Sequence, residues 1–190
     1  MARILGFCGT AKNTGKTTAM KAVLSGAYAT GARLALTSIG FDGEAADHVT
    51  GLPKPRIYAE AGTLLAIAEA CMRGSSAGIE ILRQTAMETA MGPVVIGRVS
   101  EPGQVLLAGP SKSSDVRQVC ALLDKEGCDL ILLDGALGRI APMTVADGII
   151  VSTGAARQQD MERLGRESAG LGLIFRLPLS KSSLQEGIRE

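Results

Sequence analysis

A segment near the N-terminus constrains this chain more than any other: Gly9 to Thr18 reads G-T-A-K-N-T-G-K-T-T. A short apolar run from Arg3 to Cys8 precedes it and predicts a β-strand, and a helical pattern begins near Lys16. A strand, a glycine-containing loop and a helix in this order are the context that a phosphate-binding loop requires. We therefore predict that this loop surrounds the phosphate groups of a nucleotide.

Each residue type in the loop suits a task at a phosphate chain. The N–H groups of residues 12–17 can converge on the α- and β-phosphate oxygens, with the helix N-terminus beneath them. Gly15 lets the backbone approach closely, and Lys16 supplies a positive charge across the β- and γ-phosphates. Thr17 is predicted to ligate Mg²⁺ through its hydroxyl, and Thr18 to donate to the α-phosphate. The remaining predicted nucleotide contacts in the loop are Gly9, Thr10, Lys12, Asn13 and Thr14.

The spacing departs from the usual G-x₄-G-K-[ST], because Thr10 follows a first glycine that lies one position earlier, at Gly9. In this form, G-T-x₄-G-K-T, the loop resembles that of dethiobiotin synthetase and related cobyric-acid-type synthetases. More broadly it is similar to the P-loop class that contains ParA/MinD, the nitrogenase iron protein and the signal-recognition-particle ATPases and GTPases. The resemblance implies a P-loop NTPase fold, a three-layer α/β/α arrangement with a mostly parallel sheet, and a homodimer.

Proteins of that class often carry a second lysine early in the loop, which reaches the nucleotide of the partner subunit. Such a lysine normally lies five residues before the phosphate-binding one, where this chain has Ala11. Lys12 lies four residues before Lys16, so an intersubunit contact and a solvated loop lysine both remain open for it.

The metal side of the site needs a carboxylate at the end of a strand. Residues 130–135 read L-I-L-L-D-G, four apolar residues followed by Asp134, which we predict holds the water shell of Mg²⁺. Asp42 follows the second predicted strand, and in the resembling class an acid near there contacts Mg²⁺ or orients the attacking group. A turn-forming aspartate before Gly43 is the alternative for Asp42. The predicted metal-side residues are thus Thr17, Asp42 and Asp134.

Further candidates lie in other loops. Arg139 follows Asp134 at the edge of the sheet where α/β proteins bind ligands, so it is predicted to stabilise a transferring phosphoryl group or bind an acidic substrate. An exposed surface arginine is equally consistent with the sequence. The resemblance to the synthetases puts adenine near the loop after residues 148–152, which makes Thr153 a predicted contact. His48 is interpreted as a surface residue or, alternatively, a substrate-side acid or base.

Composition excludes several function classes. The chain has 190 residues, a net charge of +1, no Trp, two Tyr and three Phe, so neither a basic surface nor an aromatic platform for nucleic acid is expected. No apolar stretch is long enough to predict a membrane helix. The four cysteines lack C-x-x-C spacing and there is one histidine, which makes a zinc site improbable and favours reduced thiols in the cytoplasm.

Strand and helix patterns alternate along the chain, which predicts an α/β fold with a mostly parallel sheet covered on both faces. One domain is predicted over residues 1–178, with 179–190 either a loose tail or the start of a further segment. Strands are predicted over residues 33–39, 94–99, 105–108, 128–133, 148–152 and 173–175. Helices are predicted over residues 62–72, 77–91 and 157–166, and also after Ser113 or Ser114, with Val116, Val119, Cys120 and Leu123 facing inward.

Three functions are compatible with such a loop, because the fold and the motif are shared by all of them. The first is a Mg²⁺-dependent ATPase that acts as a nucleotide switch or reactivating accessory protein on a partner protein. The D-G-A-x-x-R loop at residues 134–139 and a T-G-A turn resemble small P-loop proteins linked to aminomutases. The second is a synthetase of the dethiobiotin type, although that family's E-G-A-G motif is replaced here by D-G-A-L-G. The third is a small-molecule kinase with lid arginines at Arg157, Arg163 and Arg166.

A preference for ATP over GTP is the first testable prediction. A guanine-specific site would typically show N-K-x-D or T-K-x-D after a late strand, and neither motif occurs in this sequence. Competition of unlabelled GTP against labelled ATP measures the preference. Displacement of ATP by GTP at an equal or lower concentration would contradict it.

Overall fold

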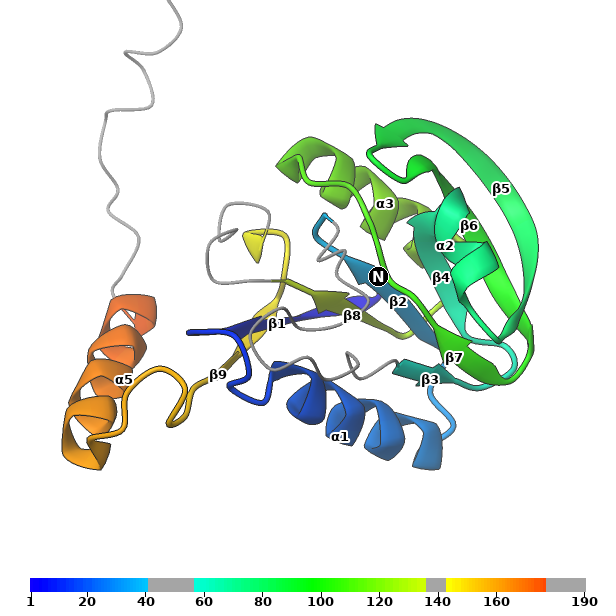
Figure 1. The fold of residues 1–190 in the computed structure, drawn as a ribbon. Helices are drawn as coiled ribbons and strands as arrows, with labels where there is room; N and C mark the ends of the chain where they lie inside the picture. The colour runs from blue at the N-terminus through cyan, green and yellow to red at the C-terminus, as the bar shows by residue number, and fades with distance from the viewer. Residues whose placement is uncertain (41–56, 136–142, 177–190) are drawn as a thin grey trace, which may run out of the picture.

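The computed structural model describes residues 1–40, 57–135 and 143–176 of the chain. Its centre is a sheet of seven strands in the order β5-β6-β4-β2-β8-β1-β9, and β3 and β7 form a separate two-stranded sheet (Figure 1). The strands are β1 (Arg3–Gly9), β2 (Leu34–Ser38), β3 (Ile57–Ala59), β4 (Leu64–Ala68), β5 (Gly78–Thr89), β6 (Gly92–Glu101), β7 (Gly103–Val105), β8 (Leu130–Asp134) and β9 (Gly148–Ser152). The described helices are α1 (Lys16–Ala29), α2 (Glu69–Gly74), α3 (Ser113–Lys125) and α5 (Met161–Arg176).

Most of the central sheet is parallel, as predicted. Strands β4, β2, β8, β1 and β9 are joined by parallel ladders. Strand β6 runs antiparallel to β4, and β5 runs antiparallel to β6, so these two strands form a hairpin added to the β4 edge. The chain is therefore a mixed α/β protein whose parallel half contains β1, the strand before the predicted phosphate loop.

Helices cover both faces of the parallel part (Figure 1). On one face, Met20 and Leu24 of α1 belong to the same buried cluster as Phe7 and Leu132. The opposite face contacts α3 through a second cluster of buried residues, which includes Val119, Leu123, Ile131 and Leu133. Neighbouring residues of one strand thus divide between two cores, which explains why these strands are continuous apolar runs without alternation.

The same feature explains why one predicted helix is wrong. Residues 62–72 were expected to be helical from the spacing of Leu64, Ile67 and Cys71, but residues 64–68 form β4 and only the short α2 follows. All five residues of β4 are buried, because its two faces meet the two different cores. A short apolar run buried on both sides cannot be told from a buried helix by periodicity alone.

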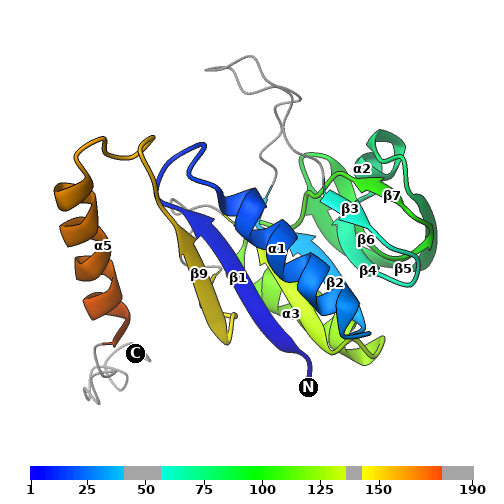
Figure 2. The ribbon, with the colours of Figure 1, turned by 90° about the horizontal axis from the view of Figure 1, so that it is seen from below.

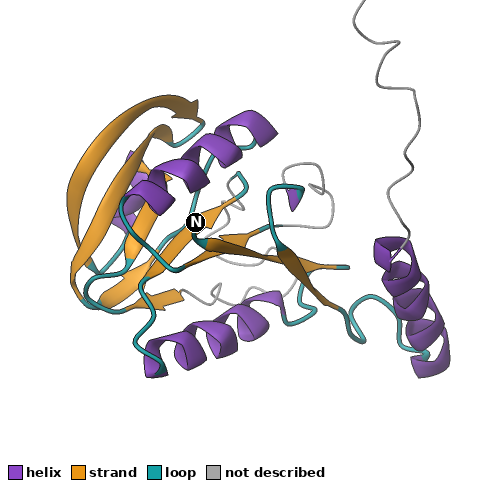
Figure 3. Ribbon diagram, turned by 180° about the vertical axis from the view of Figure 1, so that it is seen from behind, coloured by secondary structure: helices purple, strands orange, loops and turns teal. Residues whose placement is uncertain are grey.

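The predicted helix over residues 77–91 is also wrong, for a different reason. This segment is β5, the long outer strand of a curved hairpin (Figure 3). Its pairing with β6 shifts register between Ile81 and Arg83 and again between Gln84 and Glu88. In a regular strand Ile79 and Met87 would face the same side, yet they pack against opposite cores. Because of these irregularities, the apolar residues of β5 do not alternate with polar ones every two residues, and their spacing in the sequence resembles that of a helix.

Smaller corrections concern boundaries. The strand predicted at residues 105–108 is β7, which lies slightly earlier, and residues 173–175 belong to α5 instead of a last strand. Helix α3 buries its four predicted inward residues, but its N-cap is Lys112, without a side-chain hydrogen bond. None of the described helices is both long and apolar enough to cross a lipid bilayer.

The order of the strands identifies the edge where a ligand would bind. From β1 the chain continues through α1 to β2 on one side, whereas from β8 it continues to β9 on the other side. Strands β1 and β8 are neighbours, and β2 and β9 lie on opposite sides of this pair. Helix α1, which follows β1, lies on one face of the sheet and α3 on the other (Figure 2). Open α/β sheets bind ligands at such a switch point. It lies between Gly9 and Asp134, the last residues of the two strands.

Candidate functional site

The loop between β1 and α1 is closed by a hydrogen bond within it. The Thr14 hydroxyl donates to the Ala11 carbonyl at 2.9 Å, and Thr14 is buried. A Cβ atom added at Gly9 would lie 2.6 Å from the Thr14 Oγ1, so a larger residue there would disturb the closure. Gly15, the N-cap of α1, has φ 88°, a left-handed conformation that favours glycine. Both glycines of the motif are therefore required by the shape of the loop.

The N-terminus of α1 presents unused hydrogen-bond donors. Its N-cap makes no side-chain hydrogen bond, and its first turn contains no acidic residue. The first helical bond runs from Ala19 N to Gly15 O at 2.9 Å, and the amides of residues 16–18 make no backbone hydrogen bond within the described part of the chain. Because the helix dipole adds partial positive charge at the same place, this end of α1 favours an anion.

Lys16 and Asp134, predicted as the phosphate-binding and metal-side residues, meet at this end of α1. The Lys16 Nζ lies 2.9 Å from the Asp134 Oδ1 and donates a hydrogen bond to the Gly135 carbonyl at 2.8 Å. The side chains of Lys16 and Asp134 are 20% and 21% exposed. The contact follows from the β1–β8 ladder, in which Phe7 is paired with Asp134. Two groups far apart in the sequence are thus in direct contact.

Backbone hydrogen bonds hold Asp134 from both sides. Ile39 N donates to the Asp134 carbonyl at 2.7 Å, and Gly135 N donates to the Phe7 carbonyl at 2.9 Å. Ser38, the register partner of Asp134 on β2, is buried and donates from its hydroxyl to the Gly40 carbonyl at 3.2 Å. The sequence analysis missed Ser38 and the carbonyl of Gly135. A polar residue closing an apolar strand was the available signal for Ser38.

Close packing beneath the site explains the glycine after Asp134. A Cβ atom added at Gly135 would collide with the Met143 Cε, and one added at Gly6 would lie 2.8 Å from the Met143 Sδ. Met143 is buried in the cluster on the α3 face. The glycines let this side chain fill the space under the ends of β1 and β8.

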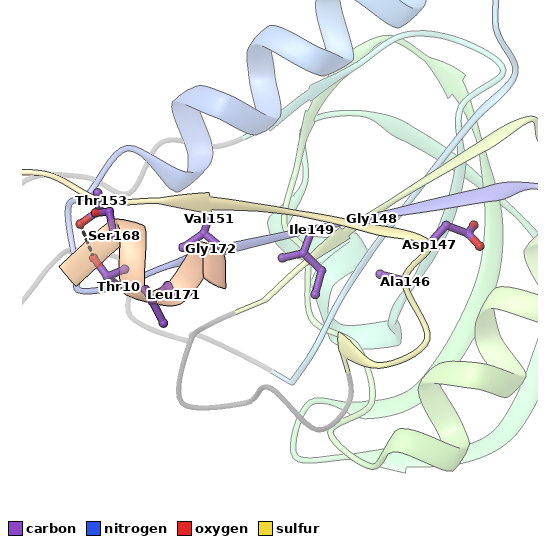
Figure 4. Close-up of a pocket in the computed structure, with 10 residues that line it drawn as sticks. All are labelled: Thr10, Ala146, Asp147, Gly148, Ile149, Val151, Thr153, Ser168, Leu171 and Gly172. Carbon is purple, nitrogen blue, oxygen red and sulfur yellow. Dashed lines mark hydrogen bonds between the residues drawn. The ribbon is translucent and has the colours of Figure 1, made fainter. Parts of the chain in front are cut away.

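A cleft of about 540 Å³ lies beside the loop, between β9 and α5 (Figure 4). Thr10 and Thr153 mark one end of it, and the Thr10 Oγ1 donates to the Thr153 Oγ1 at 2.8 Å. Ile149, Val151 and Leu171 contribute apolar walls. The predicted contact Thr153 is therefore next to the first residue after β1, at the opening of a largely apolar cleft.

The remaining predicted residues divide into two groups. Thr17 is half-buried, and Lys12, Asn13 and Thr18 are exposed around the loop. Asp42, His48 and Arg139 lie outside the described residues, so their roles stay predictions.

The described residues contain no group of three or more His, Cys, Asp or Glu side chains that could hold a metal ion by themselves. All four cysteines are buried and unbridged. Burial raises the pKa of Cys71 and of Cys128 to about 11 and that of Cys120 to about 12. Burial also raises the pKa of Cys8, although the positive charge of Lys16 partly offsets the increase. These thiols are protonated at neutral pH and are poor nucleophiles.

No protein-family model matches this chain, and comparisons with curated proteins and with solved structures find no match either. Functional conclusions therefore depend on the geometry and chemistry described above.

A pair of glycine substitutions tests the loop geometry. Gly15→Ala forces a side chain into the left-handed region and should lower the free energy of unfolding by about 1–2 kcal/mol. Gly26→Ala, in the same helix, also faces open space but has no positive φ, and should raise it by about 0.5–1 kcal/mol. Urea denaturation measures both variants. Equal effects of the same sign would contradict the conformation assigned to Gly15.

Proposed function

We propose that this chain is a P-loop nucleotide-binding protein that takes ATP together with Mg²⁺ and hydrolyses it, working as a nucleotide switch or accessory ATPase on a partner protein. The observation that carries the proposal is the contact between Lys16 and Asp134, with 2.9 Å between Nζ and Oδ1, at an α1 N-terminus that no side chain caps. A cation, a carboxylate and a set of unused amides at one sheet edge are what a metal-bound phosphate chain requires. The finer fold proposed is a three-layer P-loop NTPase.

The chain's own groups would divide the work on the phosphates. The amides at the start of α1 donate to no backbone carbonyl in the described chain and would donate to phosphate oxygens. Lys16 would neutralise charge between the β- and γ-phosphates. Gly15, which lacks a side chain and has open space around it, lets the phosphate chain approach the backbone.

The residues at the site fit the chemistry of Mg²⁺. Thr17 offers a hydroxyl and Asp134 a carboxylate, both half-buried, and oxygen ligands of this kind are those that Mg²⁺ prefers. Mg²⁺ usually takes one or two protein oxygens, keeps several waters and binds substrate phosphates, which suits a site without a protein-only ligand cluster among the described residues. When bound, the ion would withdraw charge from the β- and γ-phosphate oxygens. Thr17 would hold it directly and Asp134 through water.

The nucleoside is proposed to lie toward the cleft beside Thr153. That cleft adjoins the loop through the Thr10–Thr153 hydrogen bond and has apolar walls that suit a flat, largely apolar base. A homodimer, with Lys12 near the partner's nucleotide, also belongs to this proposal.

The contacts of three arginines and the state of the cysteines bear on the alternatives to hydrolysis. The arginines that a kinase would use as a lid are ion-paired with glutamates of α5: Arg157 and Arg163 with Glu167, and Arg166 with Glu162. The described cysteines are protonated and buried, so none offers a thiolate for covalent transfer. A synthetase or a kinase remains the alternative.

Lys16→Ala tests nucleotide binding. Loss of the ammonium leaves phosphate charge uncompensated and should weaken ATP·Mg²⁺ binding by about 2–3 kcal/mol, or roughly 30- to 150-fold. Lys21→Ala is the matched control, because it removes the same charge from an exposed position of α1. Isothermal titration calorimetry measures both variants. Equal affinities of Lys16→Ala and wild type would refute the site.

The class of reaction is tested by phosphate release from ATP. A switch should hydrolyse ATP slowly alone and faster with its purified protein partner, and the Lys16→Ala variant should abolish both rates. A synthetase should instead require a carboxylate or bicarbonate, and a kinase a hydroxyl or phosphate acceptor. If a small-molecule acceptor but no protein stimulates phosphate release, the switch proposal is wrong and one of these alternatives takes its place.

A further inference from the structure

We propose that Asp134 makes the site selective for metal-complexed over metal-free nucleotide. Its carboxylate binds the Lys16 ammonium and so competes with the phosphate groups of a metal-free nucleotide for that charge. The inference rests on the proposed function, because it assumes that a nucleotide binds at the loop. It goes further by assigning Asp134 a role in the binding step itself, separate from any role in turnover.

The first observation is that the chain itself supplies hydrogen-bond acceptors for Lys16. The Lys16 ammonium is held by two oxygens, the Asp134 Oδ1 at 2.9 Å and the Gly135 carbonyl at 2.8 Å. Two of its three N–H donors are therefore engaged by the chain itself. Its phosphate-binding charge is already compensated by a carboxylate. A phosphate that recruits this ammonium must compete with Asp134 for it.

Charge at the loop is the second argument. The first turn of α1 contains no acidic residue, so Asp134 supplies the carboxylate that Lys16 contacts in the described structure. A metal-free triphosphate would bring several negative charges close to this carboxylate, and the single charge of Lys16 cannot neutralise both. Since the two side chains are only about one-fifth exposed, water screens this repulsion weakly.

A divalent cation reverses the balance. Bound to the phosphates, Mg²⁺ would put positive charge in front of the Asp134 carboxylate, which then attracts the complex. Lys16 is released toward the phosphate oxygens at the same time. Asp134 therefore weakens binding of the metal-free nucleotide and strengthens binding of the Mg²⁺ complex. Removing its charge should tighten binding of the metal-free nucleotide and narrow the difference in affinity between the two forms.

The experiment compares ATP affinities in excess MgCl₂ and in excess EDTA by isothermal titration calorimetry. In Asp134→Asn, metal-free ATP should bind about tenfold more tightly than in wild type, and the ratio of the dissociation constants in EDTA and MgCl₂ should fall by at least that factor. Asp134→Ala should behave in the same way, which covers a defect particular to the Asn side chain. Glu80→Gln removes one negative charge from an exposed position on β5 and should change neither affinity.

The outcomes separate the two proposals. Wild-type binding of ATP·Mg²⁺, with tighter metal-free binding in both Asp134 variants, supports the inference. If wild type binds ATP·Mg²⁺ but both variants bind metal-free ATP no better than wild type, the inference is overturned and the proposed function stands. If wild type binds ATP under neither condition, both proposals fail. Thermal unfolding followed by circular dichroism establishes that each variant is folded.

Discussion

The parallel pairing of β1 with β8 is the interaction on which the site depends. β8 comes late in the chain, yet it lies between β1 and β2 and forms ladders with both. This pairing aligns Phe7 with Asp134 and brings the carboxylate beside the first residue of α1. The strand can occupy a central position because its apolar residues are buried on both faces, with Leu132 in one core and Leu133 in the other. Hydrophobic burial thus determines where the charged groups meet.

Dense packing under the carboxyl edge limits how far these charged groups can move. Met143 fills the space that Gly6 and Gly135 leave open, on the face opposite α1. A Cβ atom added at Gly109 would collide with the Ser38 carbonyl, so the segment before α3 lies directly against the end of β2. The strand ends therefore rest on close-packed side chains and backbone. Close packing of this kind fixes the orientation of the strand ends. The part of the site that can adjust is the Lys16 side chain, which can exchange one oxygen acceptor for another.

Much of the parallel half could be predicted from the sequence, because there local signals and tertiary packing agree. The strand–loop–helix at the N-terminus, the strand ending in Asp134 and the inward face of α3 are found where predicted. The sequence failed where packing overrides a local pattern, in the doubly buried β4 and the irregular β5. It also could not indicate that Lys16 would bond to the Gly135 carbonyl, since that contact exists only once β8 lies beside β1. Asp42 and Arg139 lie outside the described residues.

The two halves of the sheet differ in a way that bears on function. Every predicted nucleotide or metal contact within the described part of the chain belongs to the parallel half, on β1, α1, β8 or the loops at their ends, or, for Thr153, directly after β9. The antiparallel hairpin has a long outer strand whose register shifts disrupt its free edge, a feature that discourages uncontrolled pairing with other chains. A phosphate site of the kind proposed is common to switches, synthetases and kinases. What distinguishes them is the group that receives or responds to the phosphoryl transfer, and that group must be positioned by elements other than the loop.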